Sequence, residues 1–372
     1  MRVMIIAGEA SGDLHGAGVV RELKRRLPGC DIYGIGGDKM HAAGMKLIYH
    51  NRELAFMGFW EVLQHLPLIR SVEKTLEALL KVQKPDVLLL IDYPGFNLRF
   101  ANAARRYGIR IVYYISPQVW AWNPGRVKRM KGLIDKMLVV FPFEVDIYRK
   151  EGIDVEFVGH PLLEVFSEPQ PHAEFCKRWG FDEQKKILGL FPGSRRQEVE
   201  RIFPAMIGAA RILHRRENTQ TAVGVSSMLD GEFMKSFLRD DFPVKLIQNA
   251  TYDVMNNADL ALVTSGTATL EAGYFQTPMI VVYKTSFPTY LVGRLLLRIK
   301  DIGLVNIVAG RRIVPELLQS RVTPQRLAAK ASEMLAAEER QSEIAEALAI
   351  VREKLGTPGA SARVVESILS MA

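Results

Sequence analysis

Short apolar runs alternate along this chain with longer stretches in which apolar residues recur every three or four positions. In the first half the runs predict strands at residues 2–7, 31–35, 86–92, 110–116 and 136–140. In the second half they predict strands at 186–191, 219–225, 244–247, 260–264 and 279–283. Strands that alternate with helices indicate parallel sheets with crossover helices, so we expect an α/β protein built from Rossmann-like units.

The two halves are separated by a polar stretch at residues 164–174, which contains Pro169 and Pro171. Such composition is typical of a linker between domains. A length of 372 residues is also typical of two domains rather than one. We therefore predict one Rossmann-like domain over 1–165 and a second over 175–345.

The hydropathy pattern predicts no membrane-spanning helix, because the apolar runs, such as 87–91 and 260–263, are far shorter than the roughly 18 residues that a span needs. The apolar run at 3–7 is too short for a signal peptide, so we expect a cytoplasmic protein. The two cysteines, Cys30 and Cys176, are too few for a disulfide scaffold.

The net charge of +8 suits a polyanionic partner: nucleotide phosphates, an anionic membrane surface or nucleic acid. No RNP-type aromatic motif, zinc finger or long basic tract is present, so we expect no nucleic-acid partner.

Two loops that follow predicted strands in the first half carry acidic residues. The first contains Glu9, Ser11 and Asp13 among small residues, which suits a ligand, although a plain glycine turn capped by Ser11 or Asp13 explains it as well. The second begins with Asp92 and contains Asn97. A carboxylate at the end of a buried strand is a candidate general base, and the alternative is an aspartate that caps the following helix.

A third loop, at 116–122, contains Trp120 and Trp122 and precedes a basic helix that includes Arg126. The tryptophans and cations could form a wall for a sugar or a phosphate, and packing in the core explains the tryptophans equally well.

Two loops in the second half suit a nucleoside diphosphate. The first combines Gly193 and Ser194 with Arg195 at a helix start, where backbone N–H groups and a guanidinium can hold two phosphoryl groups. The second contains Ser265, Gly266, Thr267 and Thr269, followed by Glu271, whose carboxylate can accept both hydroxyls of a ribose. A hydroxyl-capped helix is the alternative for the second loop.

Taken together, the motifs resemble the lipid-A-disaccharide synthase family, a group of GT-B glycosyltransferases with two Rossmann-like domains facing across a cleft. The matching segments, in chain order, are GEASGD at 8–13, Met57-Gly58 with EVL at 61–63, DYPGFN at 92–97, SPQVWAW at 116–122, VGHPL at 158–162, PGSRRQE at 192–198, SGTATLE at 265–271, and Asn306 with AGRRIVPELLQ at 309–319. The match departs from the family at Leu304-Val305, where Leu-Pro is frequent, and at residues 123–125, where basic residues are frequent.

The resemblance implies that UDP-2,3-diacylglucosamine donates its sugar, with inversion, to the 6-hydroxyl of 2,3-diacylglucosamine 1-phosphate. It implies a first domain that binds the acceptor and lipid, a second domain that binds the UDP-sugar, and C-terminal helices over 346–372 that pack back on the first domain. Asp92 is the expected general base, and Glu9 and Asp13 are the next candidates for that role. The resemblance places the donor at Gly193, Ser194, Arg195, Glu198, Ser265, Gly266, Thr267, Thr269, Glu271 and Asn306. No cofactor is expected, since the UDP-sugar is a substrate, and no loop carries a DxD pair for a metal.

The acyl chains of these substrates require an apolar surface near the site. The dense apolar stretch at 54–68 is a candidate, although an ordinary buried helix pair is favoured by the pattern alone. A second candidate is 290–299, either as a peripheral anchor with Arg294 and Arg298 or as a core helix. For acceptor and lipid binding we select Ser11, Met57, Phe59, Trp60, Asn97, Trp120 and Arg126, and we expect peripheral association with the inner membrane. The sequence leaves open whether the protein forms a homodimer.

Two other interpretations remain at this point. Another UDP-sugar enzyme, such as a soluble glycosyltransferase or a UDP-N-acetylglucosamine 2-epimerase, would share the phosphate and ribose loops but would not need acyl chains. A non-catalytic glycolipid carrier could use the same fold. The apolar stretch at 54–68 argues against the first, and Asp92 together with Arg195 argues against the second.

Overall fold

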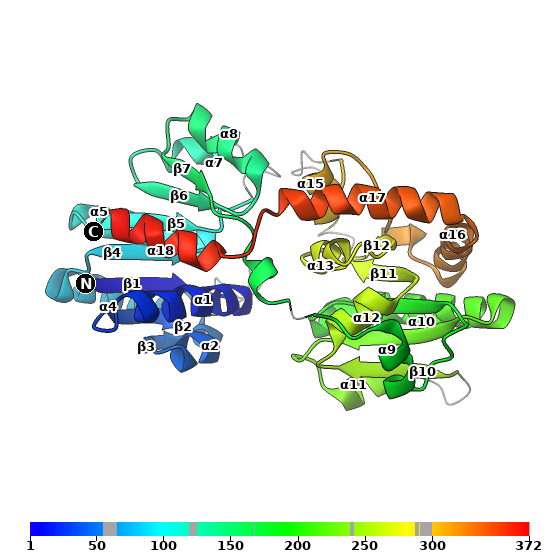
Figure 1. The fold of residues 1–372 in the computed structure, drawn as a ribbon. Helices are drawn as coiled ribbons and strands as arrows, with labels where there is room; N and C mark the ends of the chain where they lie inside the picture. The colour runs from blue at the N-terminus through cyan, green and yellow to red at the C-terminus, as the bar shows by residue number, and fades with distance from the viewer. Residues whose placement is uncertain are drawn as a thin grey trace. The chain divides into compact units, whose positions relative to one another are not determined.

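The computed structural model describes residues 1–54, 65–118, 125–166, 168–238, 242–286, 290 and 300–371. The chain divides into two compact units (Figure 1). Unit 1 comprises Met1–Val165 with Leu355–Ala372, and unit 2 comprises Phe166–Lys354. The C-terminal segment that belongs to unit 1 therefore starts at Leu355, whereas the sequence analysis placed its start at residue 346.

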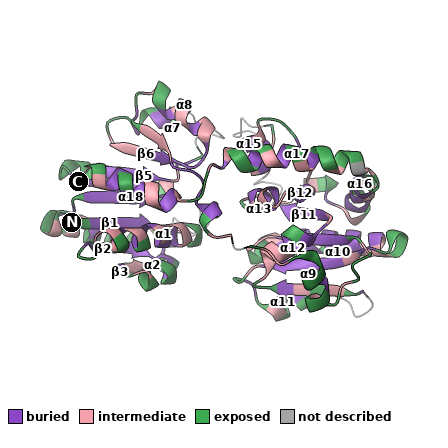
Figure 2. Ribbon diagram, viewed as in Figure 1, coloured by how far each residue is buried: buried purple, intermediate pink, exposed green. Residues whose placement is uncertain are grey.

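Unit 1 is built on a parallel sheet. Within the described residues its strands are β1 (Arg2–Ala7), β2 (Asp31–Gly36), β3 (Lys46–His50), β4 (Val87–Ile91), β5 (Arg110–Tyr114), β6 (Lys136–Val139) and β7 (Val155–Phe157), in the spatial order β3-β2-β1-β4-β5-β6-β7. Every residue of β4 is buried, as expected for a central parallel strand covered on both faces (Figure 2).

Helices cover this sheet. They are α1 (Ala10–Arg26), α2 (Asp38–Ala42), α4 (Leu66–Gln83), α5 (Pro94–Arg106), α7 (Gly125–Lys128), α8 (Pro142–Lys150) and α18 (Ala360–Met371), with short 3-10 turns η1 (Asn51–Glu53) and η2 (Pro161–Glu164). Helix α4 buries Ile69, Val72, Leu76 and Leu80, whose spacing of three or four residues makes one apolar face. Helix α18 packs on α1 so closely that a Cβ at Gly18 would lie 2.4 Å from Ser361 Oγ.

Unit 2 repeats the design with a second parallel sheet. Within the described residues its strands are β8 (Ile187–Phe191), β9 (Gln220–Val225), β10 (Val244–Gln248), β11 (Leu260–Thr264), β12 (Met279–Tyr283) and β13 (Glu316–Leu318), in the order β10-β9-β8-β11-β12-β13. Its helices are α9 (His172–Trp179), α10 (Arg196–Glu217), α11 (Gly231–Lys235), α12 (Thr251–Asn257), α13 (Ala268–Tyr274), α15 (Leu304–Ala309), α16 (Pro324–Ala336) and α17 (Glu338–Lys354), with the 3-10 turn η3 (Gln319–Arg321). The predicted α/β class with two Rossmann-like sheets is confirmed.

The hydropathy pattern did not predict β3, β7 and β13. All three are edge strands of their sheets, and none of them has a fully buried residue. An edge strand packs on fewer neighbours, so it needs no continuous apolar run and leaves a weak signal in the sequence. Among the described residues, no helix is long and apolar enough to cross a membrane.

Candidate functional site

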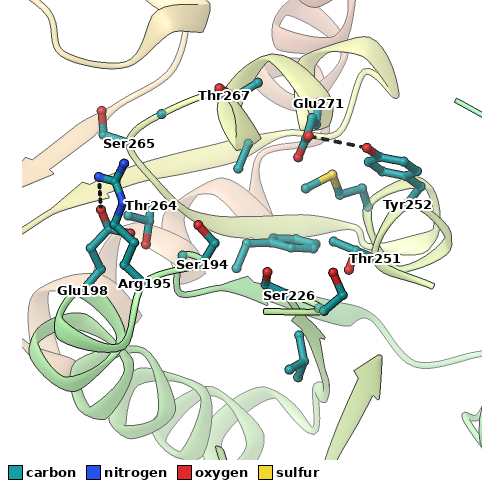
Figure 3. Close-up of a pocket in the computed structure, with 18 of the residues that line it drawn as sticks. Ser194, Arg195, Glu198, Ser226, Thr251, Tyr252, Thr264, Ser265, Thr267 and Glu271 are labelled. Atoms are coloured by element: carbon teal, nitrogen blue, oxygen red, sulfur yellow. Dashed lines mark hydrogen bonds and ion pairs between the residues drawn. The ribbon is translucent and has the colours of Figure 1, made fainter. Parts of the chain in front are cut away.

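A cavity of about 530 Å³ opens in unit 2 at the carboxyl ends of β8, β9 and β11 (Figure 3). This is the edge at which open α/β sheets bind their ligands. The cavity is lined by Phe191, Gly193, Ser194, Arg195, Glu198, Gly224, Val225, Ser226, Ser227, Asn249, Thr251, Tyr252, Met255, Thr264, Ser265, Gly266, Thr267, Ala268 and Glu271. It brings together the two loops that the sequence selects for a nucleoside diphosphate.

One end of the cavity suits an anion. Gly193, at a φ of +106°, turns the chain from β8 toward α10, and Arg195 is exposed beside it. Arg195 Nη1 lies 3.5 Å from Glu198 Oε1, an exposed pair that an incoming phosphate can displace at little cost. The second loop lies alongside because β8 and β11 are paired, and it exposes Thr267 at the start of α13. The guanidinium of Arg195 and the hydroxyl residues Ser194 and Thr267 thus line this end of the cavity, while Ser265 Oγ donates to the carbonyl of Ile302 at 2.8 Å.

The other end of the cavity carries a carboxylate. Glu271 projects from α13, and burial raises its pKa to about 7, while a hydrogen bond from Tyr252 opposes that rise. The Tyr252 hydroxyl donates to Glu271 Oε1 at 3.5 Å. Figure 3 shows this pair across the cavity from Arg195 and Glu198. The carboxylate is therefore separate from the anion-binding end.

Two residues predicted to bind the donor are structural instead. Thr269 is fully buried, and its Oγ1 donates to the carbonyl of Gly266 at 2.8 Å and accepts from Val305 N at 3.4 Å. These hydrogen bonds stabilise the loop at 265–267, which is proposed to bind phosphate. The prediction was wrong because a hydroxyl in a small-residue loop can turn inward as readily as outward.

Asn306 is likewise buried, and its amide has four protein partners. Its Oδ1 accepts from Ile313 N and Val314 N at 2.9 and 3.0 Å, and its Nδ2 donates to the carbonyl of Val314 and to Glu316 Oε1 at 3.0 and 2.8 Å. No donor or acceptor of this amide is left for a ligand. Asn306 fixes the segment that leads into β13.

Several cavity residues were missed by the sequence analysis. They lie at the carboxyl ends of β9 and β10 and at the start of α12: Gly224, Val225, Ser226, Ser227, Asn249, Thr251, Tyr252 and Met255. The predicted strands at 219–225 and 244–247 already mark this edge of the sheet, so the strand ends alone could have drawn attention to it.

In unit 1 a second group of polar residues lies where β1 and β4 end. Asp92 follows β4 and adopts a left-handed conformation with a φ of +45°, as does Tyr93 with a φ of +48°. Such backbone is strained for residues other than glycine and is held by the surroundings. The Asp92 carbonyl accepts hydrogen bonds from Asn97 Nδ2 at 2.7 Å and from the Tyr113 hydroxyl at 2.6 Å. The turn therefore holds Asp92 in a fixed place at the end of the strand.

Asp92 has the electrostatic properties of a proton acceptor. Burial, and then the negative charge of Glu9, raise its pKa to about 6. Its side chain is still partly exposed, and it does not cap the next helix, because Tyr93 holds the N-cap position of α5 and no side chain caps it. The alternative interpretation of Asp92 as a helix cap is therefore wrong.

The loop after β1 brings Glu9 to the same place. Strands β1 and β4 are neighbours, and a Cβ at Gly8 would lie 2.3 Å from the Tyr93 ring, so the two loops are in contact. Glu9 holds the N-cap position of α1 and is partly exposed, and Ser11 is exposed on the first turn.

Two predicted site residues in unit 1 are turned into the protein. Asp13 is only 6% exposed, and its carboxylate accepts from the backbone N–H groups of Gly37, Lys39 and Met40 at 2.7, 3.1 and 3.0 Å. It thereby caps α2 rather than its own helix. Asn97 is fully buried and donates to the carbonyls of Ile91 and Asp92. Both residues position the loops, and neither offers a surface to substrate.

Four of the predicted lipid-binding residues, Met57, Phe59, Trp60 and Trp120, lie outside the described residues. Arg126 is described and lies in α7, which follows the tryptophan loop. The start of that loop is anchored, because Ser116 Oγ donates to the buried Glu144 at 2.6 Å.

The chain has close relatives. Its sequence matches the family described as lipid-A-disaccharide synthetase over residues 3–363. It is 45% identical to the lipid-A-disaccharide synthase of Syntrophus aciditrophicus, covering 99% of this chain and 97% of the relative. It is 44% identical to the lipid-A-disaccharide synthase of Geobacter sulfurreducens, covering 100% and 97%.

Solved structures with low sequence identity share the fold. The UDP-GlcNAc 2-epimerase of Neisseria meningitidis bound to UDP-GlcNAc has a TM-score of 0.66 at 15% identity and covers 100% of both chains. CalG4, the calicheamicin glycosyltransferase, has a TM-score of 0.61 at 14% identity and covers 100% of this chain and 98% of its own. The family match and the full-length relatives decide between these enzyme types: this chain belongs to the lipid-A-disaccharide synthetase family and is a glycosyltransferase of lipid A biosynthesis.

Proposed function

We propose that the enzyme transfers 2,3-diacylglucosamine from its UDP donor to the 6-hydroxyl of 2,3-diacylglucosamine 1-phosphate. The products are the β-1,6-linked disaccharide 1-phosphate and UDP. The observation that carries this proposal is Asp92, a partly exposed carboxylate held at the end of β4 with a pKa raised to about 6. Such a group is ionised at neutral pH and is basic enough to accept a proton in the transition state.

The proposed donor site is the cavity of unit 2. The UDP diphosphate lies at Ser194, Arg195 and the loop from Ser265 to Thr267, and the ribose hydroxyls donate to Glu271. Glu198 is the resting partner of Arg195 and releases it to the phosphate. Asn306 and Thr269 support these loops and are not ligands.

The proposed chemistry is a single displacement. Asp92 accepts the proton of the acceptor 6-hydroxyl as that oxygen forms a bond to C1 of the donor sugar. The bond from C1 to the UDP oxygen breaks at the opposite face, so an α-linked donor gives a β-linked product. Arg195 and the loop N–H groups take up the charge that develops on UDP, and no metal is needed in this scheme.

Both substrates carry acyl chains, and we place them on the apolar stretch at 54–68. Support comes from Leu54, the first residue of this stretch, which is fully buried. Its carbonyl accepts a hydrogen bond from Tyr93 at 3.0 Å. The stretch therefore begins next to the residue that follows Asp92. Peripheral association with the inner membrane, with 290–299 as a further contact, is part of the same proposal.

The test is a reaction with both acylated substrates and the full-length enzyme, with and without EDTA. We expect UDP and a disaccharide in equal amounts, a β configuration at the new linkage by NMR, and no loss of rate with EDTA. An α-linked product would refute the single displacement, and a loss of rate that added Mg²⁺ restores would refute the metal-free scheme. A separate incubation with UDP-N-acetylglucosamine tests the alternative: its conversion to the 2-epimer, with no disaccharide formed from the acylated substrates, would refute the assigned reaction.

A further inference from the structure

Tyr252 is the one aromatic hydroxyl among the described residues that line the donor cavity. It lies on α12, faces Glu271 on α13, and donates to Glu271 Oε1 at 3.5 Å (Figure 3). The sequence motifs do not include Tyr252, because it sits in a short helix outside the glycine-rich loops.

The position of Tyr252 is fixed by neighbouring rings. Its ring meets Phe166 edge to face at a centroid distance of 5.0 Å and lies 5.8 Å from Phe275. Phe166 in turn stacks on Tyr274 at 4.2 Å. Aromatic contacts of this kind favour the ring position that places the Tyr252 hydroxyl against Glu271.

A hydrogen-bond donor such as Tyr252 helps a buried carboxylate to act as a ribose ligand. Burial favours the neutral acid at Glu271, and a neutral acid accepts hydrogen bonds from ribose hydroxyls more weakly than an ionised carboxylate does. A donor on Oε1 favours the ionised form and fixes the plane of the carboxylate. Glu271 is itself one of the residues that line the cavity.

We propose that Tyr252 is a positioning residue for the donor: its hydroxyl holds the Glu271 carboxylate in the orientation that selects a ribonucleotide over a 2′-deoxyribonucleotide. This inference rests on the proposed binding of UDP in the unit 2 cavity. It assigns the sugar selectivity of that cavity to a pair of side chains rather than to Glu271 alone.

Tyr274 provides a matched control. It belongs to the same ring cluster, but its hydroxyl accepts a hydrogen bond from Arg352 Nη2 at 3.5 Å rather than contacting Glu271. The Arg352 guanidinium also lies over the Tyr274 ring, 4.4 Å from its centroid. Tyr252→Phe and Tyr274→Phe therefore make the same chemical change in one cluster, and only the first removes a partner of Glu271.

The experiment measures the Kd of UDP and of 2′-deoxy-UDP by calorimetry for the wild type and the two variants at pH 7.5. The ratio of the two Kd values reports only the contact to the 2′-hydroxyl. We expect the wild type to favour UDP by about tenfold, the usual effect of one hydrogen bond to a charged group. Tyr252→Phe should reduce the ratio to about two, and Tyr274→Phe should leave it unchanged.

The outcomes separate this inference from the proposed function. A Tyr252→Phe ratio equal to that of the wild type overturns the role of Tyr252 and leaves UDP binding intact. A wild type that binds UDP and 2′-deoxy-UDP equally overturns the ribose contact of Glu271 and the inference with it. A wild type that binds neither nucleotide overturns the donor site itself. Equal losses of ratio in both variants overturn the inference too, because the effect then comes from the ring cluster as a whole.

Discussion

Asp92 in unit 1 and Glu271 in unit 2 are both carboxylates near the end of a central buried strand, and burial raises the pKa of each. Their other neighbours differ. A hydrogen-bond donor lowers the pKa of each, the Tyr93 backbone N–H at Asp92 and the Tyr252 hydroxyl at Glu271, but only Asp92 has a like charge nearby, Glu9, which raises its pKa further. Asp92 and the following Tyr93 both have left-handed backbone, while Glu271 lies on an ordinary helix.

This difference bears on the two roles that we propose for these carboxylates, a general base and a ribose ligand, and burial sets the pKa of Glu271, at about 7, above that of Asp92, at about 6. A like charge makes a carboxylate more willing to accept a proton, and a hydroxyl donor makes it more willing to stay ionised and accept hydrogen bonds. The first property serves a general base, and the second serves a ligand for sugar hydroxyls. Each role can be tested by removing one carboxylate and measuring both catalysis and binding.

The largest expected effect follows Asp92→Asn. The amide has nearly the shape of the acid but cannot accept the proton, so kcat should fall by about 10³-fold, within the range usual for a general base. The Kd of UDP should not change, because Asp92 is not among the residues that line the donor cavity. Steady-state rates and calorimetry check the two parts. A variant that keeps more than a tenth of the wild-type kcat would move the base elsewhere, with Glu9 the first alternative.

The next effect concerns stability rather than chemistry. Asp13→Ala should lower the free energy of unfolding by about 3 kcal/mol, because three backbone N–H groups at the start of α2 lose their acceptor. Thermal unfolding with and without UDP would measure the loss. Asp38→Ala is the control, since its carboxylate is exposed and paired with the exposed Arg52. A stable Asp13→Ala protein with an abolished kcat would restore Asp13 to the reacting groups.

The sequence analysis predicted the central strands and the loops at their carboxyl ends, because a strand buried on both faces must be apolar along its whole length. It could not predict which way a polar side chain turns. Asp13, Asn97, Thr269 and Asn306 all belong to the selected motifs, yet the structure turns each of them toward backbone groups. A loop held close to a ligand needs such internal supports, and they have the same residue types as ligands.

Tyr252 illustrates the opposite error. It lies in a short helix with no glycine-rich loop around it. The role proposed for it depends on a contact with Glu271, nineteen positions further along the chain. That contact exists only because α12 and α13 pack together in the folded protein. Local pattern can locate the edge of the sheet at which ligands bind, but a pair of side chains from two helices requires the tertiary structure.

A smaller effect is expected from Glu271→Gln, and it should appear in binding alone. The glutamine can still accept one ribose hydroxyl but has no charge, so we expect about a tenfold weaker Kd for UDP at pH 8. The pH dependence is a sharper test. The Glu271 pKa of about 7 means that the wild type gains ionised carboxylate as pH rises from 6 to 8. Its preference for UDP over 2′-deoxy-UDP should therefore increase over this range and stay flat in the variant. If the wild-type preference for UDP over 2′-deoxy-UDP does not change with pH, the assignment of Glu271 as the ribose ligand is contradicted.

The smallest effect is expected from Glu9→Gln, and it should appear only as a shift in pH. Asp92 must be ionised to act as a base, so the activity of the wild type should fall as pH drops through about 6. Because the charge of Glu9 raises the Asp92 pKa, its removal lowers that pKa, and the acid limb of kcat/KM should move to lower pH. At pH 5 the kcat/KM of the variant, expressed as a fraction of its own maximum, should then be about two- to fivefold above the same fraction for the wild type. Asp86→Asn is the control. Asp86 immediately precedes β4, at the end of the strand opposite to Asp92, and its carboxylate accepts a hydrogen bond from Arg2 N. If both variants keep the wild-type profile, Glu9 does not tune Asp92, and burial alone sets the difference between the two carboxylates.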